Sequence, residues 1–464
     1  MQQESIVSHP YWIVNRFALG GLLSLTLLSI ATAPPVESEE MKRNRVLLQQ
    51  LADRDWVVRD AAEKQIVAMG LQAVPLLRRA ATSNDPEVRR RAMRILPGLE
   101  HALRVRPKRY TFSVVEQPIG KVIETLKKES GYKIENHLGL ITNPPGPEGK
   151  VVPGERKFTY HFKEATWWQI LDRINEDVPL QPPMNYGDDV VRLYRAHGRH
   201  SSSPYVGYDG GFRYVANSLT LHRSVEFGMR PHPSGVRSES LLLNLTLYSE
   251  PHLPFLSVDQ PRLEIAQDDR RGSMVPLPPT NEAEEGILGR VVTRRYYGGT
   301  SKQPSVQVSV PLAAGAVGAK SLALIRGVIP VTLLAEQRPV VVCEDVANAK
   351  DFKKAIEGIE FQVRQVKILP NNQVLMELHV LNRLNPSDYN LMNTLYQRLE
   401  LYDNKGVKFQ NYGSSWGGGG AGFQLTLTFG NFNVKMGPPA KLIFQHWETC
   451  THEVTFELKD VPLP

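Results

Sequence analysis

The chain has 464 residues, of which 41% are hydrophobic and 8% aromatic, and this composition excludes disorder over most of its length. The length predicts about three to four domains. Two cysteines exclude a disulfide-framework fold and a cysteine-rich metal site. The net charge of +7 is unevenly placed, because residues 41–109 hold sixteen Lys or Arg against seven Asp or Glu.

Residues 17–33 form an apolar run near the start of the chain. The run is shorter than the roughly 20 residues of a membrane-spanning helix, and small residues precede Ala31, where a signal peptidase could cut. The positive charges of residues 42–45 argue against export under the positive-inside rule. We nevertheless predict export to the periplasm or cell envelope, with residues 1–33 as a signal peptide or membrane anchor. A buried core helix is the alternative.

Residues 41–108 contain an internal repeat with a period of 30 residues. The matching positions are an Asp, an Arg and apolar residues at helical spacing. In the two copies they are Asp55, Val58, Arg59, Ala62, Ile66 and Met69, then Asp85, Val88, Arg89, Ala92, Leu96 and Leu99. The segment resembles HEAT repeats of the short bacterial type, in which such Asp and Arg residues tie neighbouring helices together. Two units rarely bury a core alone, so we expect the segment to pack against the next domain. An unrelated helical hairpin is the alternative.

Residues 109–195 alternate short strand and helix patterns. The expected elements are a strand, a helix and a strand at 110–115, 118–126 and 132–134, and a second such set at 157–162, 166–174 and 190–194. Pro118 suits the first position of a helix, and Thr166 with Gln169 forms a capping-box pattern. The order resembles the short N-terminal domains of bacterial secretins, which implies protein–protein assembly in the cell envelope. A plain small α+β domain is the alternative.

Residues 196–211 are rich in Ser, Gly and His, and they predict a linker. His197 and His200 within it could contact a metal ion. Zinc sites need three or four ligands and no third ligand is near in the sequence, so we assign no metal site there.

From residue 212 the sequence is rich in strand patterns and contains two similar stretches, Leu263–Gly272 and Leu399–Gly406. We predict two tandem antiparallel β-sandwiches of immunoglobulin-like type, at residues 212–338 and 339–464. The expected fold class is therefore a multidomain α+β protein. It consists of a short HEAT-type helical segment, a small βαβ-βαβ domain of secretin type and the two β-sandwich modules.

No stretch has the pattern of a catalytic centre, and we predict no catalytic residue, metal or cofactor. Asp268 and Asp269 are adjacent, and successive strand residues point to opposite faces, so they indicate a hairpin tip rather than an acid–base pair. Gly417–Gly420 lacks the Gly-Lys-Ser/Thr ending of a phosphate-binding loop. Cys343 and Cys450 follow strand patterns in the same expected sandwich, and an oxidising compartment would permit a disulfide between them.

The basic run Arg89, Arg90, Arg91 and Arg94 lies mostly off the apolar stripe. A solvated face is the ordinary interpretation, and the functional one is a partner-binding surface. The partner would be an acidic protein, an anionic lipid or a polysaccharide, and no nucleic acid is expected for an exported protein. We expect a non-enzymatic cell-envelope scaffold that recruits protein partners. The alternatives are a binding module for an anionic envelope polymer and, less favoured, an uncharacterised enzyme.

Overall fold

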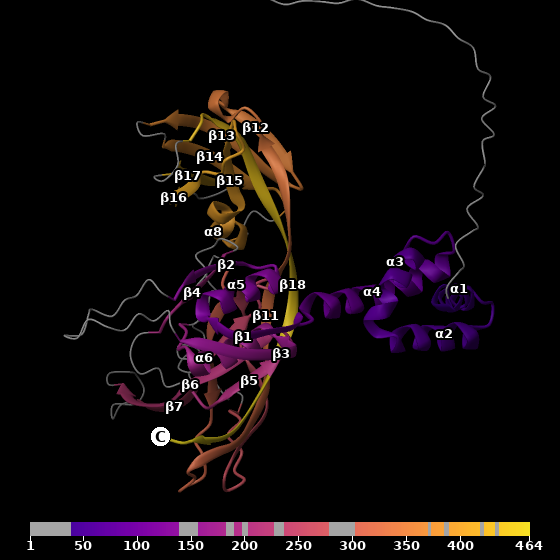
Figure 1. Ribbon diagram of the computed structural model, residues 1–464, viewed down its shortest axis with the longest axis vertical. Helices are drawn as coiled ribbons and strands as arrows, with labels where there is room; N and C mark the ends of the chain where they lie inside the picture. The colour runs from indigo at the N-terminus through magenta and orange to yellow at the C-terminus, as the bar shows by residue number, and fades with distance from the viewer. Residues whose placement is uncertain are drawn as a thin grey trace, which may run out of the picture. The chain divides into compact units, whose positions relative to one another are not determined.

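A computed structural model of the chain describes residues 39–138, 156–181, 190–196, 203–226, 236–277, 302–369, 373–384, 389–417, 422–431 and 436–464. The chain divides into two compact units, Met1–Leu96 and Pro97–Pro464 (Figure 1). The fold is mixed α+β with mostly antiparallel sheets, so the predicted coarse class is confirmed. The apolar run at 17–33 and the pair His197 and His200 lie outside the described residues.

The first unit is built from helices whose apolar faces meet in a small core. In chain order its elements are α1 (Glu39–Leu51), α2 (Trp56–Ala68), the 3-10 turn η1 (Gly70–Ala73), α3 (Val74–Ala81) and α4 (Pro86–Val105), the last of which ends in the second unit. The stripe predicted from the repeat is buried at Ala62 and Ile66 in α2 and at Val88 and Ala92 in α4. Helix α1 was not predicted. It packs against α2 and buries Leu47 and Leu51, so the stripe gains cover within the unit itself.

The two repeat copies have the same local hydrogen bonds. Oδ1 of Asp55 accepts from Val57 N–H at 2.9 Å, and Oδ1 of Asp85 accepts from Glu87 N–H at 2.8 Å. Both bonds cap the start of a helix, at α2 and at α4. The Arg of each copy reaches back to the loop before its helix: Arg59 donates to the Asp53 carbonyl, and Arg89 donates to the Ser83 carbonyl, both at 2.7 Å. The 30-residue period is therefore a period of capping contacts as well as of apolar positions.

The second unit begins with an α+β region, which we define as residues 109–194. Its elements are β1 (Arg109–Pro118), α5 (Ile119–Ser130), β2 (Lys133–His137), β3 (Lys157–Thr166), α6 (Trp167–Asp177) and β4 (Val190–Tyr194), in the predicted order. β1 pairs antiparallel with β3, and β2 pairs parallel with β4. Thr166 and Gln169 form the predicted capping box. Pro118 is the residue before α5 rather than its first helical position, a shift of one from the prediction.

The predicted linker at 196–211 is only partly a linker. It contains β5 (Val206–Asp209), which pairs with the next strand. Trp168 in α6 donates its indole N–H to the Gly211 carbonyl at 3.2 Å, and Asp172 accepts hydrogen bonds from Tyr208 and Arg213. The segment is therefore built into the junction between the α+β region and the first β-sandwich.

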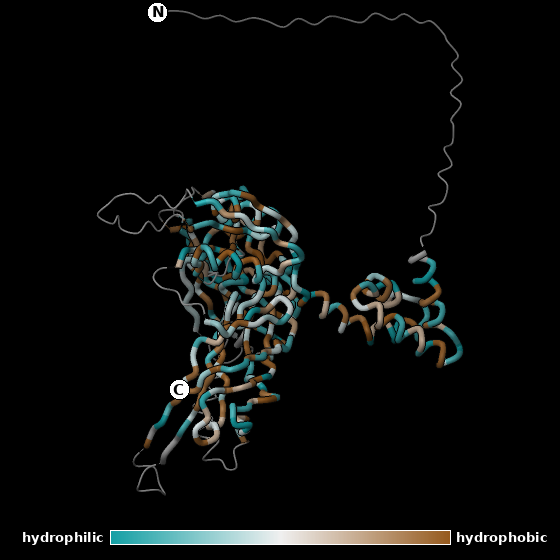
Figure 2. Tube along the Cα trace, turned by 60° about the horizontal axis from the view of Figure 1, so that its bottom comes forward, coloured by the Kyte–Doolittle hydropathy of each residue, from teal (hydrophilic) through white to brown (hydrophobic). Residues whose placement is uncertain are grey.

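Antiparallel sheets packed around two separate cores make up the rest of the second unit, and we call these two parts the first and the second sandwich. One sheet of the first sandwich has the order β10-β7-β6-β5, and its strands are β6 (Phe212–Glu226), β7 (Val236–Ser249) and β10 (Ser305–Leu312) besides β5. The second sandwich has the sheet β12-β13-β14-β17-β16. Its strands are β12 (Phe352–Ile356), β13 (Ile359–Ile368), β14 (Val374–Asn382), β16 (Gln410–Gly417) and β17 (Phe423–Gly430), and the helix α8 (Tyr389–Arg398) follows β14. Buried and more exposed residues alternate along strands such as β10 and β14, as expected for sheets with one buried face, and Figure 2 shows hydrophobic and hydrophilic residues interspersed through the chain.

The remaining sheet is shared by both sandwiches. It contains β8 (Phe255–Val258), β9 (Arg262–Asp268), β11 (Ser321–Cys343), β15 (Leu399–Asp403) and β18 (Pro439–Pro462). β11 and β18 pair antiparallel along their whole length, from Ser321 opposite Pro462 to Cys343 opposite Leu442. β9 extends this sheet at β11, and β15 extends it at β18.

The long pair corrects the predicted extent of the second sandwich, whose last residues belong to the first core. The first core contains the start of β11 together with the end of β18, including Phe456. The second core contains the end of β11 together with the start of β18, including Phe444. Residues 212–338 and 339–464 are therefore not two successive self-contained modules, because the first core is completed by Val454, Phe456, Leu458 and Val461 from the end of β18, whereas the second core lies within residues 339–464.

The two sandwiches nevertheless share the turn that the repeated sequence predicted. Asp268 ends β9 and accepts backbone N–H bonds from Arg270, Gly272 and Ala316. Asp403 ends β15 in the same way and accepts from Lys405, Val407 and Gly437. The left-handed position of the turn is Arg271 in one copy and Gly406 in the other, with φ of 68° and 78°. The match of Gly272 to Gly406 in the sequence was thus one residue out of register.

Candidate functional site

The arginine cluster predicted as an anion-binding surface is paired with carboxylates of its own unit. Nη1 of Arg91 donates to Glu63 at 2.6 Å, and its Nε donates to Glu87 at 2.7 Å. Arg94 also pairs with Glu63, and Arg90 pairs with Glu87. Arg89, the fourth arginine of the cluster, donates to the backbone carbonyl of Ser83 in the loop before α4. Two carboxylates, Glu63 and Glu87, therefore face the four arginines, so part of the positive charge that the sequence places here is compensated locally.

The ion pairs with the arginines also affect the pKa of Glu87. The hydrogen bond from Arg91 holds the pKa of Glu87 below its usual value, and the charge of Arg90 adds to the effect. The Arg91 side chain is only 14% exposed. Glu63 and Glu87 thus reduce the repulsion among these arginines, although Arg90 and Arg94 remain 76% and 65% exposed. A role of Arg89, Arg90, Arg91 and Arg94 in partner binding stays a prediction.

The predicted disulfide is wrong. Cys343 lies opposite Leu442 in the long strand pair, whereas Cys450 lies opposite Leu333, and both cysteines are free. The ten positions from Leu333 to Cys343 span about 33 Å of extended strand, and a disulfide needs Cα atoms within about 7 Å. The two residues were assigned to one sandwich, but β18 is divided between the two cores, so Cys343 lies in the second core and Cys450 packs against the first.

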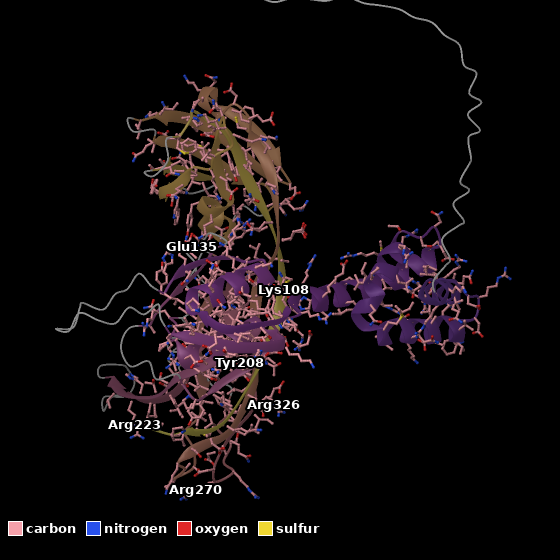
Figure 3. All side chains as sticks on the ribbon, in the orientation of Figure 1. Lys108, Glu135, Tyr208, Arg223, Arg270 and Arg326 are labelled. Atoms are coloured by element: carbon pink, nitrogen blue, oxygen red, sulfur yellow. The ribbon has the colours of Figure 1, made fainter. Side chains whose placement is uncertain are left out.

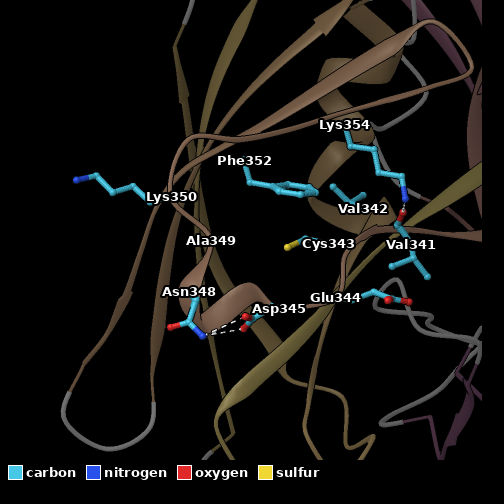
Figure 4. A pocket seen from close by; sticks show the side chains of 10 residues that line it. All are labelled: Val341, Val342, Cys343, Glu344, Asp345, Asn348, Ala349, Lys350, Phe352 and Lys354. Atoms are coloured by element: carbon cyan, nitrogen blue, oxygen red, sulfur yellow. Dashed lines mark hydrogen bonds between the residues drawn. The ribbon is translucent and has the colours of Figure 1, made fainter.

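Cys343 lines a cavity of about 530 Å³ in the second sandwich (Figure 4). Its sulfur points into this space, with Phe352 on one side and Asp345 on the other. Burial raises the pKa of the thiol, and a protonated thiol is a poor nucleophile. The cysteine therefore contributes to packing rather than to nucleophilic chemistry.

A buried polar cluster lies where the α+β region meets the first sandwich, and we call it the Glu250 cluster. Glu250 follows β7 and is fully buried. Its Oε2 accepts from Lys108 N–H at 3.2 Å and lies 3.4 Å from Nδ1 of His252. The hydroxyl of Tyr132 lies 2.9 Å from the same Nδ1. Nζ of Lys108 lies 4.8 Å from the centre of the Tyr132 ring, which is a cation–π contact.

Burial decides the protonation of the Glu250 cluster. Loss of water raises the pKa of Glu250 to about 7, although the backbone N–H and the charge of Lys108 act in the opposite direction. Loss of water, with help from the Lys108 charge, lowers the pKa of His252 to about 4, against a hydrogen bond with the Arg104 backbone. The short contact between Glu250 and His252 is therefore not an ion pair at neutral pH, because the imidazole is uncharged there.

The cluster contains polar atoms that the fold does not satisfy. Oε1 of Glu250 and Nε1 of Trp167 have no hydrogen bond of normal geometry to any described residue. The backbone N–H of Trp167 is still close enough to lower the pKa of Glu250 slightly. An unsatisfied buried polar group costs about 1–3 kcal/mol. Such costs, together with shifted pKa values, are typical of functional sites.

The sequence did contain a signal for this cluster, which was missed. Glu250 and His252 stand between the apolar end of β7 and Pro254, a place where ionisable residues are unusual. Lys108 belongs to the basic surplus of residues 41–109, but that surplus was assigned to the run around Arg91. The local signal concerns Glu250 and His252 alone, because their contact with Lys108 spans 142 residues between Lys108 and Glu250.

The first unit also exposes large apolar side chains. Trp56 is 67% exposed and Val57 is 53% exposed at the start of α2, and Met93 in α4 is 58% exposed. Single exposed apolar residues are common on protein surfaces, but an exposed Trp is less so. Trp is also the side chain most enriched where proteins bind one another tightly.

Within the described parts of the chain, no three His, Cys, Asp or Glu side chains are grouped so that they could hold a metal ion. None of the helices that the structure describes is both long and apolar enough to cross a membrane.

Comparison with known proteins adds little. No protein-family model matches the chain, and no curated protein matches it. Among solved structures, a crystal structure described as the conserved domain protein from Bacillus anthracis aligns with 56% of this chain and 91% of its own, at 12% identity and a TM-score of 0.15. A score this low carries no argument about fold or function.

Proposed function

We propose that this protein is a non-enzymatic scaffold of the cell envelope that recruits protein partners through its helical unit. The exposed indole of Trp56 carries the proposal, with the neighbouring Val57. Covering these side chains with a partner would remove apolar surface from water, at about 25 cal/mol for each Å². The surrounding helix is a rigid platform, since α2 is capped by Asp55 and braced by Arg59.

The other features fit the same role. The duplicated capping contacts of Asp55 and Asp85 support a HEAT-type repeat, a class of module that binds proteins. The order of β1, α5, β2, β3, α6 and β4 supports a secretin-type domain. Export, and an anchor at residues 17–33, are part of the proposal because both modules would then meet partners in the envelope. The alternative of an anionic polymer bound at Arg89–Arg94 is less favoured, because Arg90, Arg91 and Arg94 pair with carboxylates of the same unit.

Replacement of the exposed side chains tests the proposal. The double variant Trp56→Ala, Val57→Ser should keep the fold, because both residues are mostly in water. It should lose most of the partner protein that the wild type captures from envelope extracts after cross-linking, with the partner identified by mass spectrometry. The matched control is Val317→Ser, which removes a 94% exposed apolar side chain from the second unit. Equal capture by the double variant and the control would overturn the proposal.

A further inference from the structure

A second cavity, of about 370 Å³, lies beside the Glu250 cluster within the second unit. It is formed by the end of α4 and the segment between α4 and β1, by the loop after β7 and by β11. The residues that line it are Leu103, Arg104, Arg106, Pro107, Lys108, His252, Leu253 and Ala335. Figure 3 labels Lys108, which lies between α4 and β1.

Three exposed cations surround this cavity: Arg104, Arg106 and Lys108. None of them forms a salt bridge with a residue that the structure describes. The contact between Lys108 and Glu250 uses the backbone N–H, so the ammonium group keeps its charge available over the Tyr132 ring. Three like charges within five residues raise the local potential, and a bound anion would lower it.

The rest of the lining favours a ligand that has a hydrocarbon part next to its charge. Leu103, Pro107, Leu253 and Ala335 supply apolar surface, and Leu103 is 41% exposed without a ligand. His252 adds no charge, because it is neutral and its ring already contacts Tyr132 and the Arg104 backbone. An inorganic anion would leave the apolar surface exposed to water. A carboxylate with an apolar group would cover this surface, and its burial would contribute to the free energy of binding.

We propose that this cavity binds a carboxylate carried on a short branched apolar group. Arg104 and Arg106 bind the carboxylate through paired N–H donors, and Lys108 adds a point charge. Leu103 and Leu253 contact the hydrocarbon part. Two sources carry this chemistry, a free branched acid and the C-terminal residue of a peptide. The inference is independent of the helical surface used in the proposed function.

Titration calorimetry of the full chain at low salt tests the ligand class. The probes are 4-methylpentanoate, acetate, inorganic phosphate and N-acetyl-leucine. We expect 4-methylpentanoate to bind at least tenfold more tightly than acetate or phosphate. Tighter binding of N-acetyl-leucine than of 4-methylpentanoate assigns the site to a peptide C-terminus, and the reverse assigns it to a free acid. Equal affinity for acetate and 4-methylpentanoate, preference for phosphate, or no binding of any probe would overturn the proposal.

Variants test the assignment of residues. Arg104→Gln with Arg106→Gln should weaken binding of 4-methylpentanoate at least tenfold, with an unchanged melting temperature because both side chains are exposed. Leu103→Ser should reduce the preference for 4-methylpentanoate over acetate. The matched control is Lys353→Gln, which removes an exposed cation on β12, away from the cavity lining. Binding by the double variant as tight as that of the control would overturn the assignment.

Discussion

The two units of this protein differ in the sequence separation between residues that contact each other. In the first unit, Arg91 meets Glu63 from 28 residues away, and each repeat Arg bonds to a carbonyl six residues before it. In the second unit, Lys108 bonds to Glu250 across 142 residues, and Leu322 on β11 lies opposite Val461 on β18. Local patterns therefore determine the first unit, whereas long-range pairing determines the second.

The same difference in sequence separation determines which of the described arginines have a carboxylate partner. The arginines around Arg91 are close in sequence to Glu63 and Glu87, and a helical hairpin brings these residues together. Arg104 and Arg106 have no such carboxylate among the described residues. A count of charges in the sequence thus identified a basic segment. Only the structure shows which of its described arginines pair with carboxylates and which do not.

The largest expected effect comes from breaking a long-range contact. Phe456 is fully buried in the first core, although it lies in the last strand of the chain. Phe456→Ala should destabilise the first sandwich by about 3–5 kcal/mol through the cavity it leaves. Limited proteolysis should then show new cleavage in the strands of the first sandwich.

The matched control is Phe444→Ala, equally buried twelve residues earlier in the same strand. It should expose cleavage sites in the second sandwich instead, because Phe444 belongs to the second core. Cleavage in the same sandwich for both variants would contradict the division of β18 between the two cores.

The second effect tests the buried carboxyl of Glu250. Its folded-state pKa of about 7 is above its ordinary value of 4.5, so the folded protein binds the extra proton between these values. The stability from this group is therefore complete below pH 4.5 and is lost as the pH rises through 7. The loss is about 3 kcal/mol, so at pH 8 Glu250→Gln should be more stable than the wild type by about that amount.

His252 acts in the opposite sense. Its pKa falls from 6.5 to about 4 on folding, so its contribution is present above pH 6.5 and is lost as the pH falls through 4. Between pH 4.5 and 6.5 Glu250 lowers the stability of the wild type as the pH rises and His252 raises it by a similar amount, so the two effects cancel. Glu250→Gln should then gain about 1.4 kcal/mol of stability per pH unit across that range, and His252→Gln should lose as much. Urea unfolding at several pH values measures both slopes, and equal slopes in the two variants would refute the assignment.

The third effect concerns the short-range pairs of the first unit. Arg91→Ala removes the partner shared by Glu63 and Glu87, which are themselves only partly exposed. The helical unit should lose about 1–2 kcal/mol, as expected for charge-assisted hydrogen bonds. The exposed pair of Arg90 is the control, and Arg90→Ala should cost less than about 0.5 kcal/mol. Chemical denaturation followed by helical circular dichroism would separate the two values.

The smallest effect on stability is expected at the free cations. Arg104→Gln with Arg106→Gln should change the free energy of unfolding by no more than about 0.5 kcal/mol, since the side chains are exposed and unpaired among the described residues. A loss of stability as large as that of Arg91→Ala would show that these arginines have structural partners after all.

The sequence predicted those parts of the fold that depend on local chemistry. The strand and helix order of residues 109–194 was confirmed because capping residues such as Thr166 act within one turn. The helical repeat showed itself through Asp55 and Asp85 for the same reason. The hairpin tip at Asp268 was also correct, since a turn is set by its own few residues.

The candidate site could not be predicted in the same way. The division of β18 between two cores leaves an alternating pattern that any edge or central strand would show, so the assignment of the end of β18 to the second sandwich and the pairing of Cys343 with Cys450 were both wrong. The Glu250 cluster depends on hydrogen bonds with the distant residues Lys108 and Tyr132. A pKa shift that arises from burial has no signature in the sequence around the carboxyl itself.

The most direct test of this account compares the reactivity of individual arginines toward a dicarbonyl reagent in the native full chain, by peptide mapping. Arg94 is 65% exposed but pairs with Glu63, whereas Arg104 and Arg106 are exposed without a carboxylate partner among the described residues. We expect Arg104 and Arg106 to be modified several-fold faster than Arg94 and Arg91, and 4-methylpentanoate to protect only the first two. Equal rates for all four arginines would contradict the claim that the free positive charge lies at the cavity.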